Sequence, residues 1–390
     1  MKPSSRLEKI PPYAFAQLER KIAEKREAGV DVISLGIGDP DRPTPPVIVE
    51  AMQEAVTEPE THRYPSNRGR ADFREAVHDF YLRRFDVDLD ADSEIIPAIG
   101  AKEAIFNLNL AFLDPGDYAL AADPGYPVYT GGPWLAGAEP VLMALDPERG
   151  FVPDLGAFDV DVVRRAKLMY LNYPNNPTGA IVPDGFFEEV VDFARANDIL
   201  VVHDMAYSEI VFDGYEAPSF LATPGAKDVG IEVYSFSKGF NMTGWRCGMV
   251  VGNAEALETY WRLKTNIDSG LFEAIQLAAV AAMSTEAEAD TASMIELYKR
   301  RRDLVCDALE EVRVHVRRPH ATIYVWAPVP EGFDSSEAYA EHVLERAAVV
   351  ISPGSIYGPA GEGWFRISLT TPDERLVEAV QRLGTLRADG

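Results

Sequence analysis

Short apolar runs alternate with stretches of helical periodicity through the middle of the chain, and this alternation constrains the fold more than any other feature. Seven of these runs end in small or polar residues and are predicted to be strands: 94–100, 118–123, 140–145, 167–173, 199–204, 233–237 and 248–252. Helices are predicted between them at 102–113, 184–196 and 254–264. This succession indicates an α/β protein with one large, mostly parallel seven-stranded sheet, covered by helices on both faces.

The pattern changes near residue 282. Beyond it we predict, in order, a long helix through 309, strands at 312–316 and 322–326, a helix at 335–346, strands at 349–352 and 364–369, and a final helix. These elements indicate a second, smaller α+β domain. We therefore expect a large domain over 46–282 and a small C-terminal domain over 283–390. Residues 1–45 are too few to form a domain and are expected to pack beside the small one.

Composition and charge exclude several classes of protein. The formal net charge is −25 and no long basic run is present, so we expect no nucleic-acid partner. The longest apolar runs are far shorter than the roughly 18 residues that span a bilayer, and residues 1–9 lack the apolar stretch of a secretory signal. We expect a cytoplasmic protein without membrane contact. Two cysteines give no disulfide framework, and six histidines show no metal-ligand spacing such as HExxH, so no metal site is expected.

A lysine follows one predicted strand directly, within Ser235-Phe236-Ser237-Lys238. Taken alone, such a lysine is more often a solvated surface residue. The alternative is a lysine that forms a Schiff base, because burial and neighbouring cations can keep its amine neutral and nucleophilic. Arg246 follows eight residues later between two nearby glycines, and its guanidinium could bind a phosphate through two hydrogen bonds.

Polar side chains also follow other predicted strands. Asp204 ends the strand at 199–204, and Tyr207 comes three residues later. Taken alone, the aspartate could equally be a helix cap and the tyrosine could equally be a core residue, with no functional role for either. In a site for a pyridine cofactor, Asp204 would keep the ring nitrogen protonated and Tyr207 would bind the phenolic oxygen. Asn176 belongs to an Asn-Pro-Thr-Gly turn and could donate to the same oxygen.

Two further strand ends suit a flat, anionic cofactor. The turn at 100–103 joins a strand to a helix, so the backbone N–H groups of Ala101 and Lys102 would face an anion at the helix N-terminus. Tyr126 follows the strand at 118–123 and could stack on a planar ring. Each signal is weak by itself. The carboxyl ends of parallel strands meet at one edge of a sheet, so we expect all of these groups to lie close together.

In this order and spacing, the motifs resemble those of class I/II aminotransferases of pyridoxal 5'-phosphate (PLP) fold type I over nearly the whole chain. The resemblance implies a PLP cofactor and transamination of an amino acid with a 2-oxo acid by a ping-pong mechanism. It implies that Lys238 is both the Schiff-base residue and the proton shuttle, with Asp204 and Tyr207 as the other catalytic residues. It also implies a homodimer, in which Tyr64 of the His62-Arg63-Tyr64-Pro65 motif crosses to the neighbouring site.

The resemblance assigns the cofactor to a defined set of side chains. The implied cofactor contacts are Tyr64, Ala101, Lys102, Tyr126, Asn176, Asp204, Tyr207, Ser235, Ser237, Lys238 and Arg246. Arg366 matches the arginine of the small domain that binds the substrate α-carboxylate. The full set of implied substrate contacts is Tyr13, Gly38, Lys102, Tyr126, Asn176 and Arg366.

The substrate is indicated by four segments, which are most similar to LL-diaminopimelate aminotransferases: 11–15, 32–41, 172–177 and 266–270. That similarity implies LL-2,6-diaminopimelate and 2-oxoglutarate as substrates, in lysine biosynthesis. One branch of those enzymes carries a glutamate just after the interface tyrosine, where this chain has Pro65-Ser66-Asn67. A glutamate–pyruvate, alanine or broad-range aminotransferase therefore remains an alternative. A PLP-dependent lyase on the same scaffold, such as a C–S lyase, is a further one.

Overall fold

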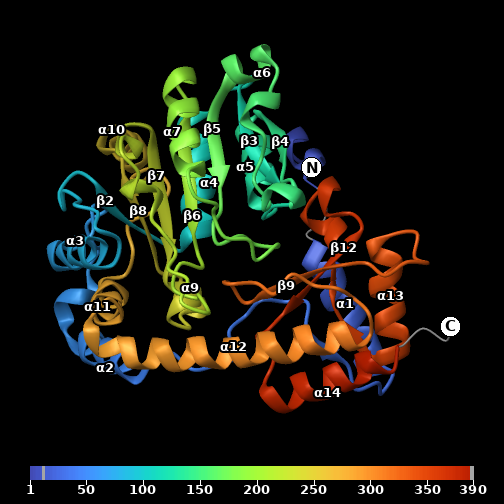
Figure 1. The fold of residues 1–390 in the computed structure, drawn as a ribbon. Helices are drawn as coiled ribbons and strands as arrows, with labels where there is room; N and C mark the ends of the chain where they lie inside the picture. Colours follow the sequence, from blue (N-terminus) through green and yellow to red (C-terminus); the bar gives the residue numbers. More distant parts are fainter. Residues whose placement is uncertain (11–13, 387–390) are drawn as a thin grey trace.

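The computed structural model describes residues 1–10 and 14–386. Its centre is a seven-stranded sheet in the order β2-β8-β7-β6-β5-β3-β4 (Figure 1). The strands are β2 (Ile95–Ala98), β3 (Tyr118–Asp123), β4 (Glu139–Ala144), β5 (Ala166–Leu171), β6 (Leu200–Met205), β7 (Gly230–Ser235) and β8 (Gly248–Gly252). Only β8 runs antiparallel to its neighbours. All seven predicted strands are confirmed in one mostly parallel sheet, with ends that differ by a few residues.

Helices cover both faces of this sheet (Figure 1). One face packs against α4 (Ala101–Phe112), α5 (Val128–Ala136) and α10 (Ala254–Lys264). The other packs against α2 (Pro46–Thr57), α3 (Ala71–Phe85), α7 (Phe186–Asn197) and α11 (Glu273–Ala282). Successive residues of β6 point to opposite faces of the sheet. Val201 packs in the core with α2, α3, α7 and α11, and Val202 packs in the core with α4, α5 and α10. The near-continuous apolar strands of the sequence follow from this burial on both sides.

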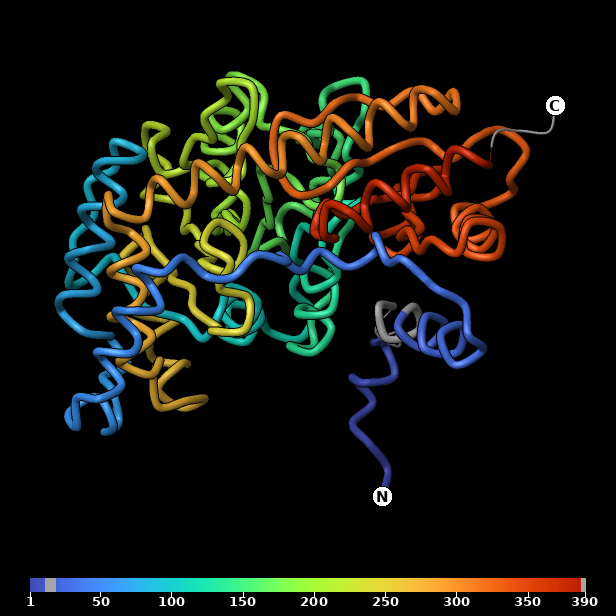
Figure 2. Tube along the Cα trace, turned by 90° about the horizontal axis from the view of Figure 1, so that it is seen from below, coloured from blue at the N-terminus to red at the C-terminus, as the bar shows by residue number. Residues whose placement is uncertain are grey.

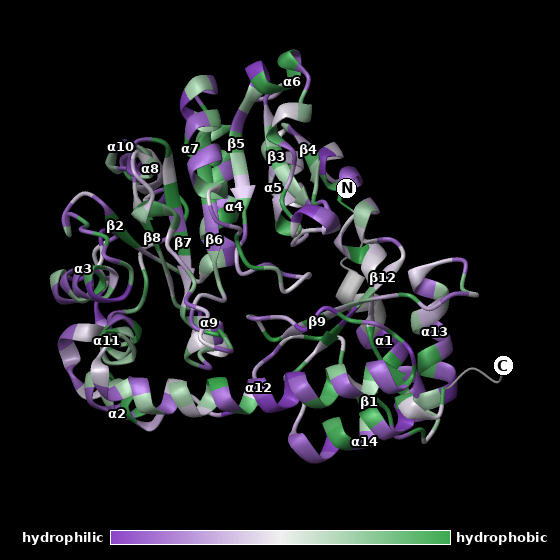
Figure 3. Ribbon diagram, in the orientation of Figure 1, coloured by the Kyte–Doolittle hydropathy of each residue, from purple (hydrophilic) through white to green (hydrophobic). Residues whose placement is uncertain are grey.

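A smaller antiparallel sheet contains β11 (Ser352–Pro353), β12 (Trp364–Ser368) and β9 (Tyr324–Pro328), in that order. It packs with α12 (Glu288–Glu311), α13 (Ser336–Ala347) and α14 (Asp373–Gly384) around a separate core. Figure 3 shows α12 as alternating bands of hydrophobic and hydrophilic residues, as expected for a helix with one buried side.

Three predictions for this part of the chain differ from the structure. The predicted strand at 312–316 is absent, because the backbone N–H groups of Arg313 and Val314 instead bond to carbonyls of the last turn of α12. The predicted long helix begins at Glu288 rather than near residue 282, after a turn that separates it from α11. The predicted strand at 349–352 is divided at Ile351 into β10 (Val349–Val350) and β11, which belong to different sheets.

The N-terminal part of the chain contacts both of these sheet-containing regions. Its elements are η1 (Ser5–Lys9), α1 (Ala14–Glu27) and β1 (Ile33–Ser34). β1 pairs in parallel with β10 of the smaller region, while Lys9 in η1 forms an ion pair with Glu139 of β4. Figure 2 shows the segment after β1 running along the molecule to α2. Among the described residues, no helix is both long and apolar enough to cross a membrane.

Candidate active site

A cavity of about 290 Å³ lies at the carboxyl edge of the large sheet, where the smaller sheet approaches it. Because the parallel strands end at this edge, residues far apart in sequence meet here. Twelve of the predicted site residues line this cavity: Gly38, Ala101, Lys102, Tyr126, Asn176, Asp204, Tyr207, Ser235, Ser237, Lys238, Arg246 and Arg366. Two do not belong to this group. The side chain of Tyr64 is 89% exposed on the single chain, and Tyr13 lies outside the described residues.

Lys238 lies on α9 (Phe236–Gly239), a single turn that follows β7 directly. The Ser235 hydroxyl caps this turn by accepting a hydrogen bond from the Ser237 N–H. The Lys238 amine donates to the Gly38 carbonyl oxygen at 2.6 Å. Burial lowers the pKa of this amine, and the nearby positive charges of Arg366 and Arg246 act in the same direction. The lysine is therefore held in a pocket that favours its neutral, nucleophilic form.

Asp204 is buried at the end of β6, and its two oxygens have different surroundings. Oδ2 accepts a hydrogen bond from the Tyr129 hydroxyl at 2.7 Å, whereas Oδ1 has no partner among the described residues. Burial raises the pKa of this carboxyl to about 6, against the opposing effect of the Tyr129 hydrogen bond. A buried carboxylate oxygen without a partner is costly. A protonated pyridine nitrogen would satisfy this oxygen and restore its charged form, so the residue fits PLP.

The part of the cavity beside Gly100 is suited to a phosphate. α4 begins after Gly100, and a Cβ at that position would lie 2.4 Å from Nη2 of Arg246. Glycine at 100 thus lets the guanidinium approach the N-terminus of the helix, where Ala101 presents its N–H. Arg246 itself has a φ of 57°, a costly conformation for a non-glycine residue that tends to be kept at functional sites. Burial and the nearby charge of Arg246 lower the pKa of Lys102, so an anion bound between these two side chains would stabilise the charged lysine.

Arg366 is 2% exposed and lies on β12, on the side of the cavity formed by the smaller sheet. Its guanidinium donates to Asn176 Oδ1 and to the Gly36 carbonyl oxygen, both at 2.7 Å. The guanidinium carbon also lies 3.9 Å from the ring centroid of Tyr324. These contacts fix a planar cation at the cavity, which suits a substrate carboxylate.

Tyr324 on β9 is the main residue that the sequence analysis missed. Its hydroxyl lies 3.1 Å from that of Tyr207, so Tyr324 links the smaller sheet to a residue that follows β6 of the large sheet. A Cβ at Gly38 would lie 2.1 Å from the same hydroxyl, which explains the glycine there. Burial opposes ionisation of Tyr324, but the neighbouring positive charge of Arg366 favours it, and the pKa of Tyr324 is lowered. No local motif marks this tyrosine, because its role depends on pairing between distant strands.

Tyr129 and Asn172 were also missed, although both lie close to recognised motifs. Tyr129 lies in the first turn of α5, three residues after Tyr126, and the two rings meet edge-on with their centroids 5.9 Å apart. Asn172 donates to the backbone oxygen of Asp204 at 2.8 Å and accepts from the Asn176 N–H at 2.7 Å. It thereby ties the Asn-Pro-Thr-Gly turn to the end of β6. Within 1–10 and 14–386, no group of three or more His, Cys, Asp or Glu residues could hold a metal ion.

Comparisons with known proteins agree with this geometry. The family model for aminotransferase class I and II matches residues 30–383. The LL-diaminopimelate aminotransferase of Moorella thermoacetica is 52% identical over 383 residues, covering 98% of each chain. That of Desulforudis audaxviator is 54% identical over 380 residues, covering 97% of this chain and 96% of its own.

Solved structures give the same result. Substrate-bound BacF from Bacillus subtilis is 38% identical and superposes with a TM-score of 0.95, covering 99% of this chain and 98% of its own. A double mutant of aspartate aminotransferase from Thermus thermophilus is 30% identical, with a TM-score of 0.91 and coverage of 99% and 100%. The predicted fold type is thus confirmed over nearly the whole chain.

Proposed function

The chain belongs to the aminotransferase class I and II family, which is PLP-dependent, and from this premise we propose that it transfers an amino group from LL-2,6-diaminopimelate to 2-oxoglutarate. The observation that carries this proposal is the likeness to enzymes named LL-diaminopimelate aminotransferase, at 52% and 54% identity over nearly the full length. The reaction would belong to lysine biosynthesis, in the cytoplasm.

The cofactor would supply an electron sink for the α-carbon of the substrate. We assign its ring nitrogen to Asp204, whose Oδ1 otherwise lacks a partner among the described residues. Its phosphate would be held by the N–H groups that begin α4 and by four side chains that line the cavity: Lys102, Ser235, Ser237 and Arg246. Tyr126 would stack on the ring, and Asn176 and Tyr207 would bind its phenolic oxygen.

The protein side chains would perform the remaining chemistry. Lys238 would attach the cofactor and then, through Nζ, remove the proton from the substrate α-carbon and deliver it again. The lowered pKa of this amine supports that role, since a protonated amine cannot act as a base. Arg366 would bind the α-carboxylate, which explains why so buried a cation is retained. Lys102 would meet the distal carboxylate of a dicarboxylic substrate.

The test is to add single amino acids to the holoenzyme and follow the absorbance of the bound cofactor, then to measure glutamate formed from 2-oxoglutarate. We expect LL-2,6-diaminopimelate to react faster than alanine or glutamate. A second candidate, a glutamate–pyruvate, alanine or broad-range aminotransferase, is favoured by Pro65-Ser66-Asn67 in place of an acidic residue. An enzyme inert to diaminopimelate but active with alanine would contradict the first proposal and support the second.

We further propose a homodimer in which Tyr64 completes the neighbouring site. An aromatic side chain that is 89% exposed on the single chain supports this, since aromatic residues are enriched at interfaces. The test is to co-express a Lys238→Ala chain with a Tyr64→Ala chain, because only mixed dimers then contain one site with both residues intact. Random pairing predicts recovery of about a quarter of wild-type activity. Activity no higher than that of the separate variants would contradict the shared site.

We also propose that residues 46–282 form a large cofactor-binding domain and 283–390 a small domain, with 1–45 beside the latter. The pairing of β1 with β10 supports this division, although η1 contacts the large sheet. Small-angle scattering with and without a dicarboxylate should detect closure of the two domains over the substrate.

A further inference from the structure

We propose that a second cavity, outside the candidate active site, binds a small aromatic anion. This cavity has a volume of about 270 Å³ and lies where the smaller sheet meets the loop after β5. Its lining includes 178–181 on the large-sheet side and, on the other, His315, Arg317, Arg318, His320, Trp326 and Trp364. It shares no residue with the cavity that holds Lys238. Its volume is near the lower end for small-molecule pockets, which suits a compact ring compound.

One wall of this second cavity is aromatic. Trp326 and Trp364 are stacked with their ring planes 7° apart and centroids at 5.9 Å, and Phe151 meets Trp364 edge-on. The indole N–H of Trp326 is buried and has no acceptor among the described residues. Phe151 has a φ of 62°, a conformation that costs energy for a residue with a side chain. A strained aromatic residue beside two stacked indoles favours a flat ring as the ligand.

The rim of the cavity is basic, which is unusual in a chain of net charge −25. It includes His315, Arg317, Arg318 and His320. Three of these face carboxylates: His315 pairs with Glu310, Arg318 with Asp303 and Asp307, and His320 with Asp213. In the described part of the chain, Arg317 has no ion pair. The positive charge of Arg317 is therefore not neutralised by a neighbouring carboxylate and can attract an anion to this rim.

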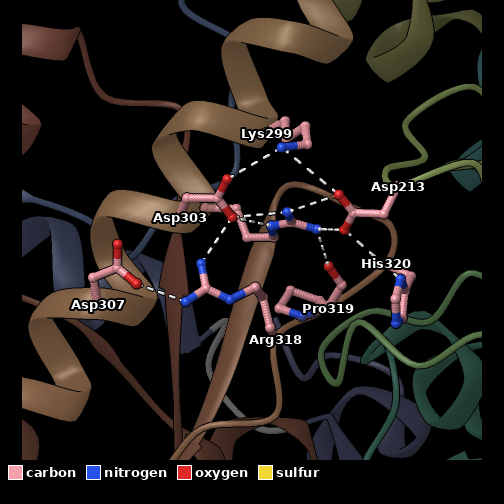
Figure 4. Close-up of polar contacts among 8 residues, drawn as sticks. Asp213, Lys299, Asp303, Asp307, Arg318, Pro319 and His320 are labelled. Carbon is pink, nitrogen blue, oxygen red and sulfur yellow. Dashed lines mark hydrogen bonds and ion pairs between the residues drawn. The ribbon is translucent and has the colours of Figure 1, made fainter.

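The same wall is fixed before any ligand arrives. Figure 4 shows Arg318, Pro319 and His320 held by a network that extends from α12 to Asp213. At its centre Arg302 is 2% exposed and donates to the Pro319 carbonyl oxygen at 2.9 Å. Asp213 and Asp303 each accept hydrogen bonds from the same guanidinium. A wall held in this way loses little conformational entropy when a ligand binds, so even a small anion can be retained.

The experiment uses the holoenzyme with 2-naphthoate as the probe and 2-oxoglutarate in excess to occupy the active site. Calorimetry should detect one equivalent of bound 2-naphthoate, and the fluorescence of tryptophan should be quenched as it binds. Arg317→Glu should weaken this binding about tenfold or more, because it replaces the attractive charge by a repulsive one. The matched control is Arg300→Glu, which makes the same charge change at an exposed position outside the cavity.

A second variant keeps the test decisive if Arg317→Glu folds poorly. Ala180 lines the cavity, so Ala180→Leu should fill part of it and also reduce binding. Both variants should retain transamination activity, which reports that the protein is folded. Complete displacement of 2-naphthoate by 2-oxoglutarate would place the probe in the active site and overturn the proposal. Equal affinity in the wild type, Arg317→Glu and Ala180→Leu would overturn it as well.

Discussion

The two sides of the candidate active site are built in different ways. On the cofactor side, Asp204 lies at the end of β6 and Lys238 directly after β7, and these two strands are parallel neighbours in the large sheet. On the substrate side, Gly38, Tyr324 and Arg366 come from three segments far apart in sequence, two of them neighbouring strands of the smaller sheet. We expect the first set of residues to perform the chemistry that is common to every amino acid substrate. We expect the second set to determine which amino acid is bound. Substitutions on the two sides should therefore differ in kind: a lower kcat for all substrates on the first, a higher KM on the second.

The largest effect is expected for Lys238→Ala on the cofactor side. The substitution removes the amine that attaches the cofactor and moves the proton, so kcat should fall by about 10⁴-fold or more. Borohydride treatment followed by peptide mass spectrometry should label the wild-type lysine and nothing at this position in the variant. Lys227→Ala, which breaks a partly exposed ion pair with Glu94, is the control and should stay active. A wild-type enzyme without label at 238 would contradict the assignment.

Asp204→Asn should come next and should separate activity from stability. Loss of the carboxylate should lower kcat by about a hundred- to a thousandfold for every amino acid. Without cofactor, burial raises the pKa of Asp204 to about 6, above the value of 3.8 for an unperturbed aspartate. The folded protein thus binds a proton more tightly than the unfolded chain, and this stabilisation is lost as the pH rises through about 6.

The Asn variant has no such proton to lose. We therefore expect cofactor-free Asp204→Asn to be more stable than the cofactor-free wild type at pH 7, by at most about 3 kcal/mol, and the difference to shrink towards pH 4. Denaturant unfolding at several pH values measures this. Asp198→Asn, at an exposed left-handed position where asparagine is well tolerated, should change neither property. Greater stability of the wild type at pH 7 would argue against an uncompensated buried carboxylate.

On the substrate side, Arg366→Lys should raise KM for amino acids by about tenfold to a hundredfold, with a smaller change in kcat. Lysine cannot donate simultaneously to Asn176, the Gly36 carbonyl oxygen and a carboxylate in the planar arrangement of arginine. The affinity for the cofactor should be unchanged, which equilibrium titration can check. A loss confined to kcat would instead place Arg366 with the chemistry common to all substrates.

The same contrast explains what the sequence could predict. The seven strands and the groups at their ends are marked by local patterns, since each polar residue follows its own apolar run. Tyr324 carries no such mark, because only the pairing of β9 with β12 brings it near Arg366. The strand predicted at 312–316 is absent for the opposite reason. Its apolar pattern is present in the sequence, but its backbone N–H groups bond to the last turn of α12 and not to another strand. Sequence motifs therefore found the residues that meet at the carboxyl edge of the large sheet, but they missed Tyr324, which only strand pairing brings there.

The smallest of these effects, and the one that joins the two sides, is expected for Tyr324→Phe. It removes the hydroxyl that lies 3.1 Å from Tyr207 and leaves the ring beneath Arg366. Loss of one hydrogen bond of this kind should lower kcat/KM by about three- to tenfold. Because the pKa of Tyr324 is lowered in the wild type, its ionisation should contribute to the alkaline limb of the pH profile, and that limb should move to higher pH in the variant.

Tyr339→Phe is the matched control, since Tyr339 is also buried among the residues of the smaller region but does not line the cavity. Its pH profile should match that of the wild type. If Tyr324→Phe lowers kcat alone and equally for all amino acids, the tyrosine acts through Tyr207 on the cofactor side. If it raises KM and leaves the alkaline limb in place, the hydroxyl only positions the substrate, and the lowered pKa of Tyr324 has no part in catalysis.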